Sequence, residues 1–239
     1  IDFDNLNFRY LETEPEVLID INLTIPKGSR VGIVGKTGSG KSTLMDILMG
    51  LLEPTGGRIR VDGNAIDAEN QNCWRQRIAH VPQHIYLSDS SITENIALGV
   101  RPDRIDPERV HQAARQAQIA EFIESHRQGY DTRVGERGVQ LSGGQRQRIG
   151  IARALYKDAD VLVFDEASSA LDTETETAVM QAVSQLDPNL TLFIIAHRVQ
   201  TLRECDLILR LEDGHLILAG SYEEVIGAQP RQAAADIRN

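Results

Sequence analysis

Long runs of apolar side chains are missing from this sequence. The longest uninterrupted run covers residues 192–196, whereas a membrane-spanning helix needs roughly 20 predominantly apolar residues. We therefore expect that no segment of the chain crosses a bilayer. The first residue is Ile1 rather than Met, and no charged-then-apolar leader opens the chain, which is typical of an excised piece or a processed product.

Cysteine is also scarce. Cys73 and Cys205 lie far apart and outside any C-x-x-C spacing, so a disulfide framework is excluded and a reducing, cytoplasmic compartment is expected. The remaining composition is ordinary, with 41% hydrophobic and 25% charged residues, which argues against disorder. A chain of 239 residues is long enough for one large domain or two small ones.

Basic residues are fewer than acidic ones. The chain has 25 Lys and Arg residues and 35 Asp and Glu residues, so its net charge is −10. A surface of this sign repels phosphate backbones on average. We therefore expect no nucleic-acid partner, although a local basic patch is compatible with this balance.

Short β-branched runs alternate with helical patterns along the chain. Strands are predicted at residues 1–8, 19–25, 30–34, 58–61, 161–164 and 192–196. Helices are predicted over residues 92–98, 107–118, 120–126, 144–156 and 175–186, and from Ser42 onward, where Leu44, Ile47, Leu48 and Leu51 recur at helical spacing. This alternation implies a parallel sheet with right-handed crossovers. Near the end, Asp213-Gly214 between two apolar runs predicts a hairpin.

A glycine-rich loop lies between a predicted strand and a predicted helix. Residues 35–42 read Gly-Lys-Thr-Gly-Ser-Gly-Lys-Ser, which fits the phosphate-loop pattern G-x-x-x-x-G-K-[ST] in its required context. Its backbone N–H groups and the following helix N-terminus favour anionic oxygens. We expect Lys41 to reach the β- and γ-phosphates of a nucleotide and the Ser42 hydroxyl to bind Mg²⁺. The alternative is a flexible Gly/Ser turn.

Two carboxylates follow the apolar run at residues 161–164. Asp165 lies at the carboxyl end of this predicted strand, where open α/β sheets place their ligand chemistry, so it is a candidate to hold Mg²⁺. Glu166 is then the candidate general base for a water in line with the γ-phosphate. The alternative is that both acids cap the following helix.

A second Ser/Gly cluster occurs at residues 141–145, which read Leu-Ser-Gly-Gly-Gln and run into a predicted helix. It predicts a second anion-binding helix end. A protein that binds phosphate through one phosphate loop does not need a second such end. At this point the sequence resembles the ATP-binding cassette (ABC) family, whose signature motif this is. The resemblance extends from about Phe3 to about Ile226, with the motifs in the family's order and spacing.

The resemblance implies that two ATP molecules are sandwiched in a head-to-tail dimer. Each signature then closes over the nucleotide held by the partner's phosphate loop, so that Ser142 and Gly144 contact the γ-phosphate of the partner's ATP. The implied partner is a second nucleotide-binding domain, as a homodimer formed on ATP binding, and the implied activity is ATP hydrolysis with Mg²⁺.

Four further positions take roles from the resemblance. Tyr10 resembles the aromatic on which adenine stacks, and Gln83 the glutamine that reaches Mg²⁺ and the attacking water. His197 resembles the switch histidine at the γ-phosphate, and Asp172 a residue that couples the two sites across the dimer. Without the resemblance each residue has an ordinary structural alternative. Tyr10 also fits an aromatic on a strand face, and Gln83 a solvated loop residue. His197 also fits a structural histidine, and Asp172 a helix cap.

The candidate site residues fall into three groups. The catalytic candidates are Glu166, His197 and Gln83, and the metal candidates are Ser42, Gln83 and Asp165. The nucleotide-binding candidates are Tyr10, Gly35, Lys36, Thr37, Gly38, Ser39, Gly40, Lys41, Ser42, Thr43, Ser142, Gly143, Gly144, Gln145 and Asp172.

The fold class implied by the resemblance is α/β, with a P-loop, RecA-like parallel sheet core, an antiparallel β subdomain and an inserted α-helical subdomain. Residues 1–239 then form a single nucleotide-binding domain. Its core and β subdomain take residues 1–84 and 159–228, the helical subdomain with the signature takes 85–158, and 229–239 form a tail.

Residues 132–138, Thr-Arg-Val-Gly-Glu-Arg-Gly, are similar to a segment of the exporter branch that touches the transmembrane partner. This implies an exporter motor at the cytoplasmic face of a membrane, with a transmembrane domain N-terminal on the same polypeptide. Residues 82–87 and 148–156 are similar to flippases of lipid-linked oligosaccharides and to polysaccharide exporters. The alternative for residues 132–138 is a charged Gly-rich loop.

Other functions are weighed against these motifs. A soluble ABC-type ATPase without a transport role stays open as an alternative, although the stretch between Ser42 and Leu141 holds no heptad run of the kind found in DNA-acting members. Translation factors of the family carry two phosphate loops, and only one is present. A GTPase needs an Asn-Lys-x-Asp motif, which the sequence lacks.

Overall fold

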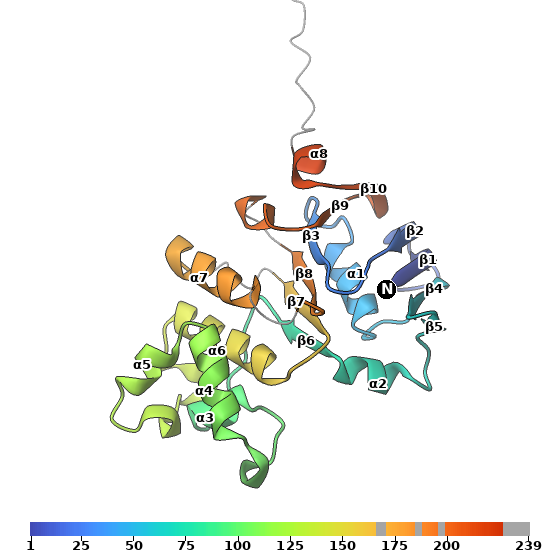
Figure 1. Cartoon of the computed structure of the whole chain (residues 1–239). Helices are drawn as coiled ribbons and strands as arrows, with labels where there is room; N and C mark the ends of the chain where they lie inside the picture. Colours follow the sequence, from blue (N-terminus) through green and yellow to red (C-terminus); the bar gives the residue numbers. More distant parts are fainter. Residues whose placement is uncertain (166–170, 185–187, 196–198, 227–239) are drawn as a thin grey trace, which may run out of the picture.

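The computed structural model describes residues 1–165, 171–184, 188–195 and 199–226. A six-stranded sheet in the order β10-β9-β3-β8-β7-β6 forms its centre (Figure 1). The strands are β3 Arg30–Val34, β6 Ile78–Val81, β7 Val161–Asp165, β8 Thr191–Ile195, β9 Leu207–Glu212 and β10 His215–Gly220. Neighbours from β9 to β6 pair in parallel, and β10 pairs antiparallel to β9. The predicted parallel sheet and the predicted hairpin at Asp213-Gly214 are therefore confirmed.

The inner strands of this sheet are covered on both faces. Alternate side chains of a strand point to opposite faces, and in β7 they enter two different cores: Leu162 and Phe164 enter one, and Val161 and Val163 enter the other. Because both faces are buried, apolar residues in β7 and β8 follow one another without alternating with polar ones.

The second sheet is antiparallel and covers one face of the first. Its order is β2-β1-β4-β5, with β1 Asp2–Phe8, β2 Leu18–Thr24, β4 Gly56–Val61 and β5 Asn64–Ala65. Helix α1, Lys41–Leu48, is buried between the two sheets through Leu44, Met45, Ile47 and Leu48. Helix α2, Gln71–Gln76, closes this core with Trp74, whose Nε1 donates to the Leu48 carbonyl at 2.6 Å.

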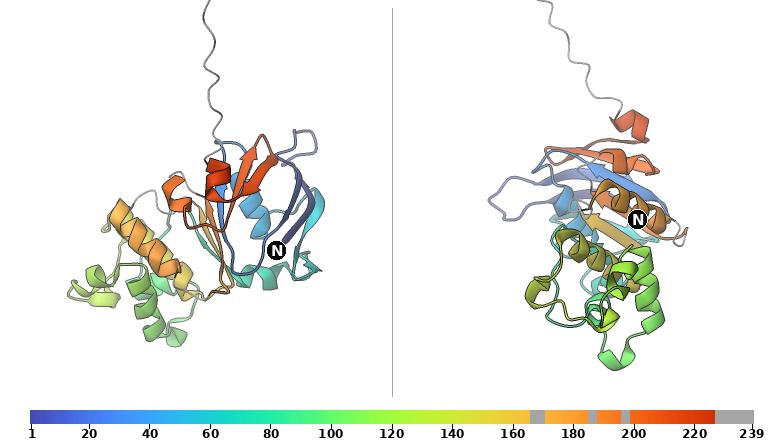
Figure 2. Two further views of the ribbon diagram at one scale, coloured as in Figure 1. Left: turned by 45° about the horizontal axis from the view of Figure 1, so that its top comes forward. Right: turned by 90° about the vertical axis from the view of Figure 1, so that its left-hand side faces the viewer.

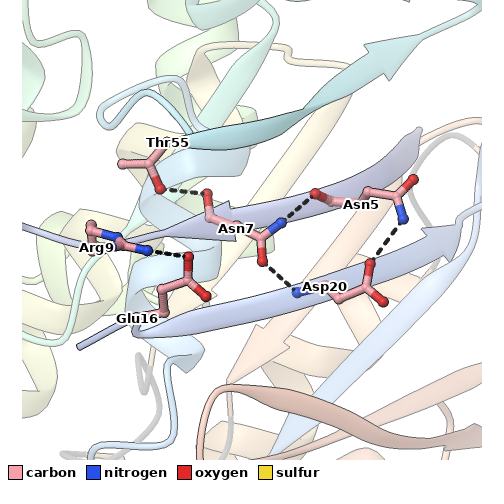
Figure 3. Close-up of polar contacts among 6 residues, drawn as sticks. All are labelled: Asn5, Asn7, Arg9, Glu16, Asp20 and Thr55. Atoms are coloured by element: carbon pink, nitrogen blue, oxygen red, sulfur yellow. Dashed lines mark hydrogen bonds and ion pairs between the residues drawn. The ribbon is translucent and has the colours of Figure 1, made fainter. Parts of the chain in front are cut away.

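Polar side chains replace part of the backbone ladder between β1 and β2. Asn5 and Asp20 have φ angles of 46° and 47°, a left-handed conformation that Asn and Asp tolerate better than most residues. The Asn5 side-chain amide donates to the Asp20 carboxylate at 2.9 Å, and the Asp20 N–H donates to the Asn7 side-chain carbonyl at 2.9 Å (Figure 3). These contacts compensate for the register shifts of this strand pair.

Helices cover the opposite face of the six-stranded sheet and gather on one side of the molecule (Figure 2). They are α3 Ile92–Ile96, α4 Pro107–Gln116, α5 Ala120–Glu124, α6 Gly143–Tyr156 and α7 Thr173–Ser184. Helix α8 Tyr222–Ile226 lies apart from them, against β9 and β10 (Figure 1). The 3₁₀ turns are η1 Pro102–Arg104, η2 Gly129–Asp131, η3 Glu136–Gly138 and η4 Val199–Leu202. Ser91 and Ser142 begin α3 and α6 with capping boxes. Within the described ranges, none of the helices has the length and apolarity to cross a bilayer.

The predicted elements agree with the structure except at a few places. Strands β5 and β6 and helices α2 and α8 are not among the predicted elements. Helix α1 ends at Leu48, so Leu51 lies beyond the helix and is exposed. Strand β6 is short and lies at the edge of the sheet. A run of four residues carries too little periodicity to be recognised in the sequence.

Candidate functional site

The carboxyl ends of the parallel strands bring most candidate residues to one edge of the six-stranded sheet. Ile33 of β3 and Asp165 of β7 both pair with Ile195 of β8, so the ends of these strands are level. Gly35 follows β3, Asp165 ends β7 and Gln83 lies exposed just after β6. This is the edge at which open α/β sheets bind their ligands. Glu166 and His197, which follow β7 and β8, lie outside the described residues.

The phosphate loop enters α1 through a glycine. Gly40 precedes the helix with a φ of 98°, and a Cβ at this position would lie 2.7 Å from Leu18 Cδ2. Both the backbone conformation and the close approach of β2 therefore require glycine. Residues 35–38 and 42 are exposed, so the loop and the first turn of α1 are open to a ligand.

Two side chains line this loop in a way that suits phosphate. Lys41 Nζ donates to the carbonyls of Gly35 at 2.9 Å and Lys36 at 2.8 Å, so its ammonium group lies over the loop. The Ser39 hydroxyl is buried and has no hydrogen-bond partner among the described residues. An orphaned donor and an ammonium group beside a helix N-terminus favour an anion.

Tyr10 stands beside the same loop. Its hydroxyl lies 3.0 Å from Thr43 Oγ1, and its ring meets the edge of Phe8 at 5.0 Å between centroids. The Tyr10 side chain is 54% exposed. A ring that is fixed at its hydroxyl end and open to solvent offers a surface on which a base can stack.

The signature begins α6. The Ser142 hydroxyl accepts from the Gln145 N–H at 3.2 Å, and the Ser142 N–H donates to Gln145 Oε1 at 2.8 Å. This capping box fixes the start of a 14-residue helix whose first residues, Ser142 and Gly143, are exposed. The signature is therefore a well-formed helix N-terminus that faces outward.

The phosphate loop and the signature of one chain lie on different sides of the sheet. Residues of α1 pack with Val163 on one face, whereas residues of α6 pack with Phe164 on the other. The separation of the two helices is visible in Figure 1. The N-termini of α1 and α6 of one chain are thus not brought together.

Asp172 forms a helix cap in this structure. Its carboxylate accepts from the Thr175 N–H at 2.9 Å and from the Thr175 hydroxyl at 2.8 Å, one turn into α7. These hydrogen bonds stabilise the charged form and hold the pKa of Asp172 below its usual value. The carboxylate is exposed, so it also faces any partner that approaches the start of α7.

Oxygen atoms dominate the metal candidates. Ser42 supplies a hydroxyl, Gln83 an amide oxygen and Asp165 a carboxylate, and each comes from the same sheet edge. Hard oxygen ligands of this kind suit Mg²⁺. Within the described ranges no three His, Cys, Asp or Glu side chains form a metal cluster.

A parallel sheet with a phosphate loop after β3, an acidic residue at the end of β7 and a buried helix α1 defines a P-loop nucleotide-binding protein. The chain belongs to the ABC transporter family, because residues 18–169 match the family model with that description. Membership of this family implies that the chain binds ATP.

Curated relatives are a flippase and an export ATP-binding/permease protein by name. The chain is 47% identical over 232 residues to an ATP-dependent lipid A-core flippase of Chromohalobacter salexigens, which covers 97% of this chain and 40% of the flippase. It is 47% identical over 225 residues to the β-(1→2)glucan export ATP-binding/permease protein NdvA of Agrobacterium fabrum, covering 94% and 38% of the two chains. The chain thus spans about 40% of the length of the relatives it matches.

A solved structure shares the fold. The structure of a bacterial Atm1-family ABC exporter with ATP bound aligns with a TM-score of 0.88 and 41% identity, over 95% of this chain and 39% of that chain. The fold is therefore that of part of an ABC exporter.

Proposed function

We propose that this chain is the ATP-hydrolysing motor domain of an ABC exporter, which dimerises around two Mg²⁺-ATP and drives export or flipping of a substrate across a membrane. One observation carries the dimer: α1 and α6 present two anion-binding helix ends on opposite faces of one sheet. Because one γ-phosphate needs donors from both, the second set comes from another copy.

Each part of the site has a role in this proposal. Tyr10 stacks on adenine, the backbone of residues 35–43 cradles the phosphates, and Lys41 contacts the β- and γ-phosphates. Mg²⁺, held by Ser42, Gln83 and Asp165, neutralises phosphate charge when it is bound. Glu166 accepts the proton of the attacking water, and His197 orients that water near the γ-phosphate. The partner's Ser142, Gly143, Gly144 and Gln145 close the opposite side, beside Asp172.

We also propose the division of the chain into subdomains. The core and β subdomain comprise residues 1–84 and 159–228, the helical subdomain comprises 85–158, and 229–239 form a tail. The packing of α3, α4, α5 and α6 against one another supports the helical subdomain, although residues of β7, β8 and α7 share the same hydrophobic core.

Coupling to a transmembrane domain is assigned to residues 132–138. The Val134 N–H donates to the Ser90 carbonyl at 3.2 Å, and the Ile92 N–H donates to the Thr132 carbonyl at 3.0 Å, so this loop is tied to the start of α3. Val139, which directly follows this loop, is 76% exposed. The names of the relatives support lipid A-core or a polysaccharide as the class of cargo. The proposal further includes a position at the cytoplasmic face of a membrane and a transmembrane domain N-terminal on the same polypeptide.

A complementation experiment tests the composite site. Lys41→Ala disables the phosphate loop, and Ser142→Asp disables the signature by charge while keeping an efficient helix N-cap. Each variant alone is expected to be inactive. A mixture contains heterodimers with one intact site, so ATPase activity returns in the mixture.

The outcome distinguishes the arrangement of the site from the activity itself. Wild-type activity should rise more steeply than linearly with protein concentration, because the dimer is the active species. Wild-type activity without recovery in the mixture contradicts the composite site. Absence of wild-type ATPase activity contradicts the proposed enzyme.

A further inference from the structure

Helix α7 and the turn η4 each follow a candidate site residue in the chain. Asp172 directly precedes α7, and η4 begins at Val199, two residues after His197. The precision of a site depends on how firmly the elements that carry its residues are held. The contacts that hold α7 and η4 in place therefore bear on Asp172 and His197.

Glu176 joins these two elements. Its N–H donates to the Asp172 carbonyl at 2.9 Å, in the first turn of α7. Its carboxylate oxygen Oε1 accepts from the Thr201 hydroxyl of η4 at 3.0 Å. The main chain of Glu176 is thus bonded to one candidate site residue, and its side chain to the turn that follows another.

The carboxylate that makes this contact is buried, because Glu176 is only 6% exposed. A buried carboxylate is costly unless it accepts hydrogen bonds, and the Thr201 hydroxyl supplies one. Hydrogen bonds to an ionised oxygen are stronger than those between neutral groups. The contact is therefore directional and shielded from competing water.

A general preference for acids at helix starts does not explain this burial. Glu174 and Glu176 both lie in the first turn of α7, where the helix dipole favours negative charge. Glu174 is exposed, whereas Glu176 is buried. Stabilisation by the dipole does not require burial, so the inward position of Glu176 indicates a role in the contact with η4.

Apolar packing holds α7 and η4 to the core separately. Val179 and Val183 anchor α7, and Leu202 anchors η4, in one hydrophobic core. A cavity of about 650 Å³ lies beside these anchors and is lined by residues of α7, β8 and η4, with Glu176 and Thr201 among them. Unfilled space provides no close packing, so the hydrogen bond is well placed to fix η4 relative to α7.

We propose that Glu176 is a positioning residue for ATP hydrolysis. Through Thr201 it holds η4, and with η4 the segment that carries His197, in a fixed position relative to Asp172. This inference rests on the proposed function of the chain. A displacement of about 1 Å at a reacting group lowers the rate of the chemical step by up to about 100-fold, whereas the phosphate loop that binds ATP lies on the other face of the sheet.

Thr201→Val removes the hydroxyl and keeps the shape of the side chain. We expect kcat for ATP hydrolysis to fall by at least about five-fold, with KM for ATP within about two-fold of wild type. Thr201→Ser keeps the hydroxyl and should restore most of the wild-type kcat. In a Glu176→Ala background, Thr201→Val should have no further effect, because the acceptor is already absent.

Thr177→Val is the matched control. It makes the same chemical change on α7, at an exposed position that lines the same cavity. The Thr177 hydroxyl donates to the Thr173 carbonyl within the helix, so kcat should stay unchanged. Urea unfolding verifies that each variant is folded, and Thr201→Ala replaces Thr201→Val if the latter is not. A smaller loss in Thr201→Val, or an equal loss in Thr201→Ser or Thr177→Val, overturns the proposal.

A second readout does not depend on hydrolysis. The ring Cε1–H resonance of His197, assigned by its loss in His197→Gln, reports the surroundings of that ring without ATP. Thr201→Val should shift this resonance, and Thr177→Val should not. Wild-type protein without ATPase activity, together with this shift, contradicts the motor function and supports the placement of His197 through Glu176. Wild-type activity with neither the shift nor the loss of kcat contradicts the placement and leaves the motor function standing.

Discussion

The hydroxyl of Tyr10 lies 3.0 Å from Oγ1 of Thr43, at the first turn of α1. The contact joins the end of β1 to the phosphate loop, because Thr43 is buried directly behind the loop. The aromatic ring is thereby fixed next to the phosphate loop while Tyr10 stays 54% exposed. The relative position of this ring and the phosphate loop is thus set within one chain.

Tyr10→Ala is expected to weaken ATP binding by about ten-fold or more, because stacking of a base on an aromatic ring contributes ~1–3 kcal/mol. Tyr10→Phe keeps the ring and loses only the hydroxyl contact with Thr43, so its affinity should stay within a few-fold of wild type. Titration with a fluorescent ATP analogue measures both. Equal loss in the two variants would show that the hydroxyl contact, rather than stacking, determines affinity.

Lys41→Ala should weaken Mg²⁺-ATP binding by at least ~10-fold, since a hydrogen bond to a charged group contributes ~1.5–3 kcal/mol. Its Nζ now bonds to the carbonyls of Gly35 and Lys36 and lies over the loop. Lys27→Ala, an exposed lysine outside the loop, is the control. Tight nucleotide binding by the Lys41 variant, measured by equilibrium dialysis, would refute the role of this side chain.

Glu166→Gln should lower ATP turnover by ~10²–10⁴-fold, because it keeps the shape of the side chain and removes the general base. The same variant should accumulate an ATP-bound dimer, detectable by size-exclusion chromatography. Glu174→Gln at an exposed position of α7 makes the same chemical change and should hydrolyse ATP normally. Normal turnover by the Glu166 variant would end its assignment as the base.

Gly150→Ala should destabilise the protein although alanine is the better helix former. A Cβ at Gly150 of α6 would lie 2.3 Å from Ile85 Cδ1, and overpacking of this kind costs ~1–3 kcal/mol against a helix-propensity gain of about 1 kcal/mol. In an Ile85→Ala background the clash is removed, so the same change should become neutral or stabilising. Urea unfolding of wild type, Gly150→Ala, Ile85→Ala and the double variant measures the coupling free energy between the two positions. An identical effect in both backgrounds would exclude this contact as the cause.

One thiol should react and one should not. Burial raises the pKa of Cys205 to about 12, so its reactive thiolate form is not populated as pH rises from 7 to 9. Cys73 is exposed. We expect iodoacetamide to modify one cysteine of the native protein, faster at higher pH, and Cys73→Ser to abolish this reaction. Mass spectrometry counts the adducts, and rapid labelling of native Cys73→Ser would contradict the burial of Cys205.

The sequence determined the parts of the protein that depend on neighbouring residues. The phosphate loop, the signature helix start and the hairpin at Asp213-Gly214 are local, because each needs only a few adjacent residues with suitable backbone preferences or capping groups. Family motifs likewise depend on contiguous residues, so the ABC family was recognisable before the fold was known.

Tertiary structure alone decided what depends on strand order and on contacts between distant segments. The placement of α1 and α6 on opposite faces follows from long-range pairing of β3, β7 and β8, which no local pattern encodes. Strand β6 was missed because its pairing with β7, rather than its own sequence, makes it a strand. One cavity is lined by four basic side chains from η1, α4 and the end of α6, namely Arg104, Arg109, Arg153 and Lys157. Each looks like an ordinary surface residue in sequence, and only the folding of these elements around one space brings their charges together.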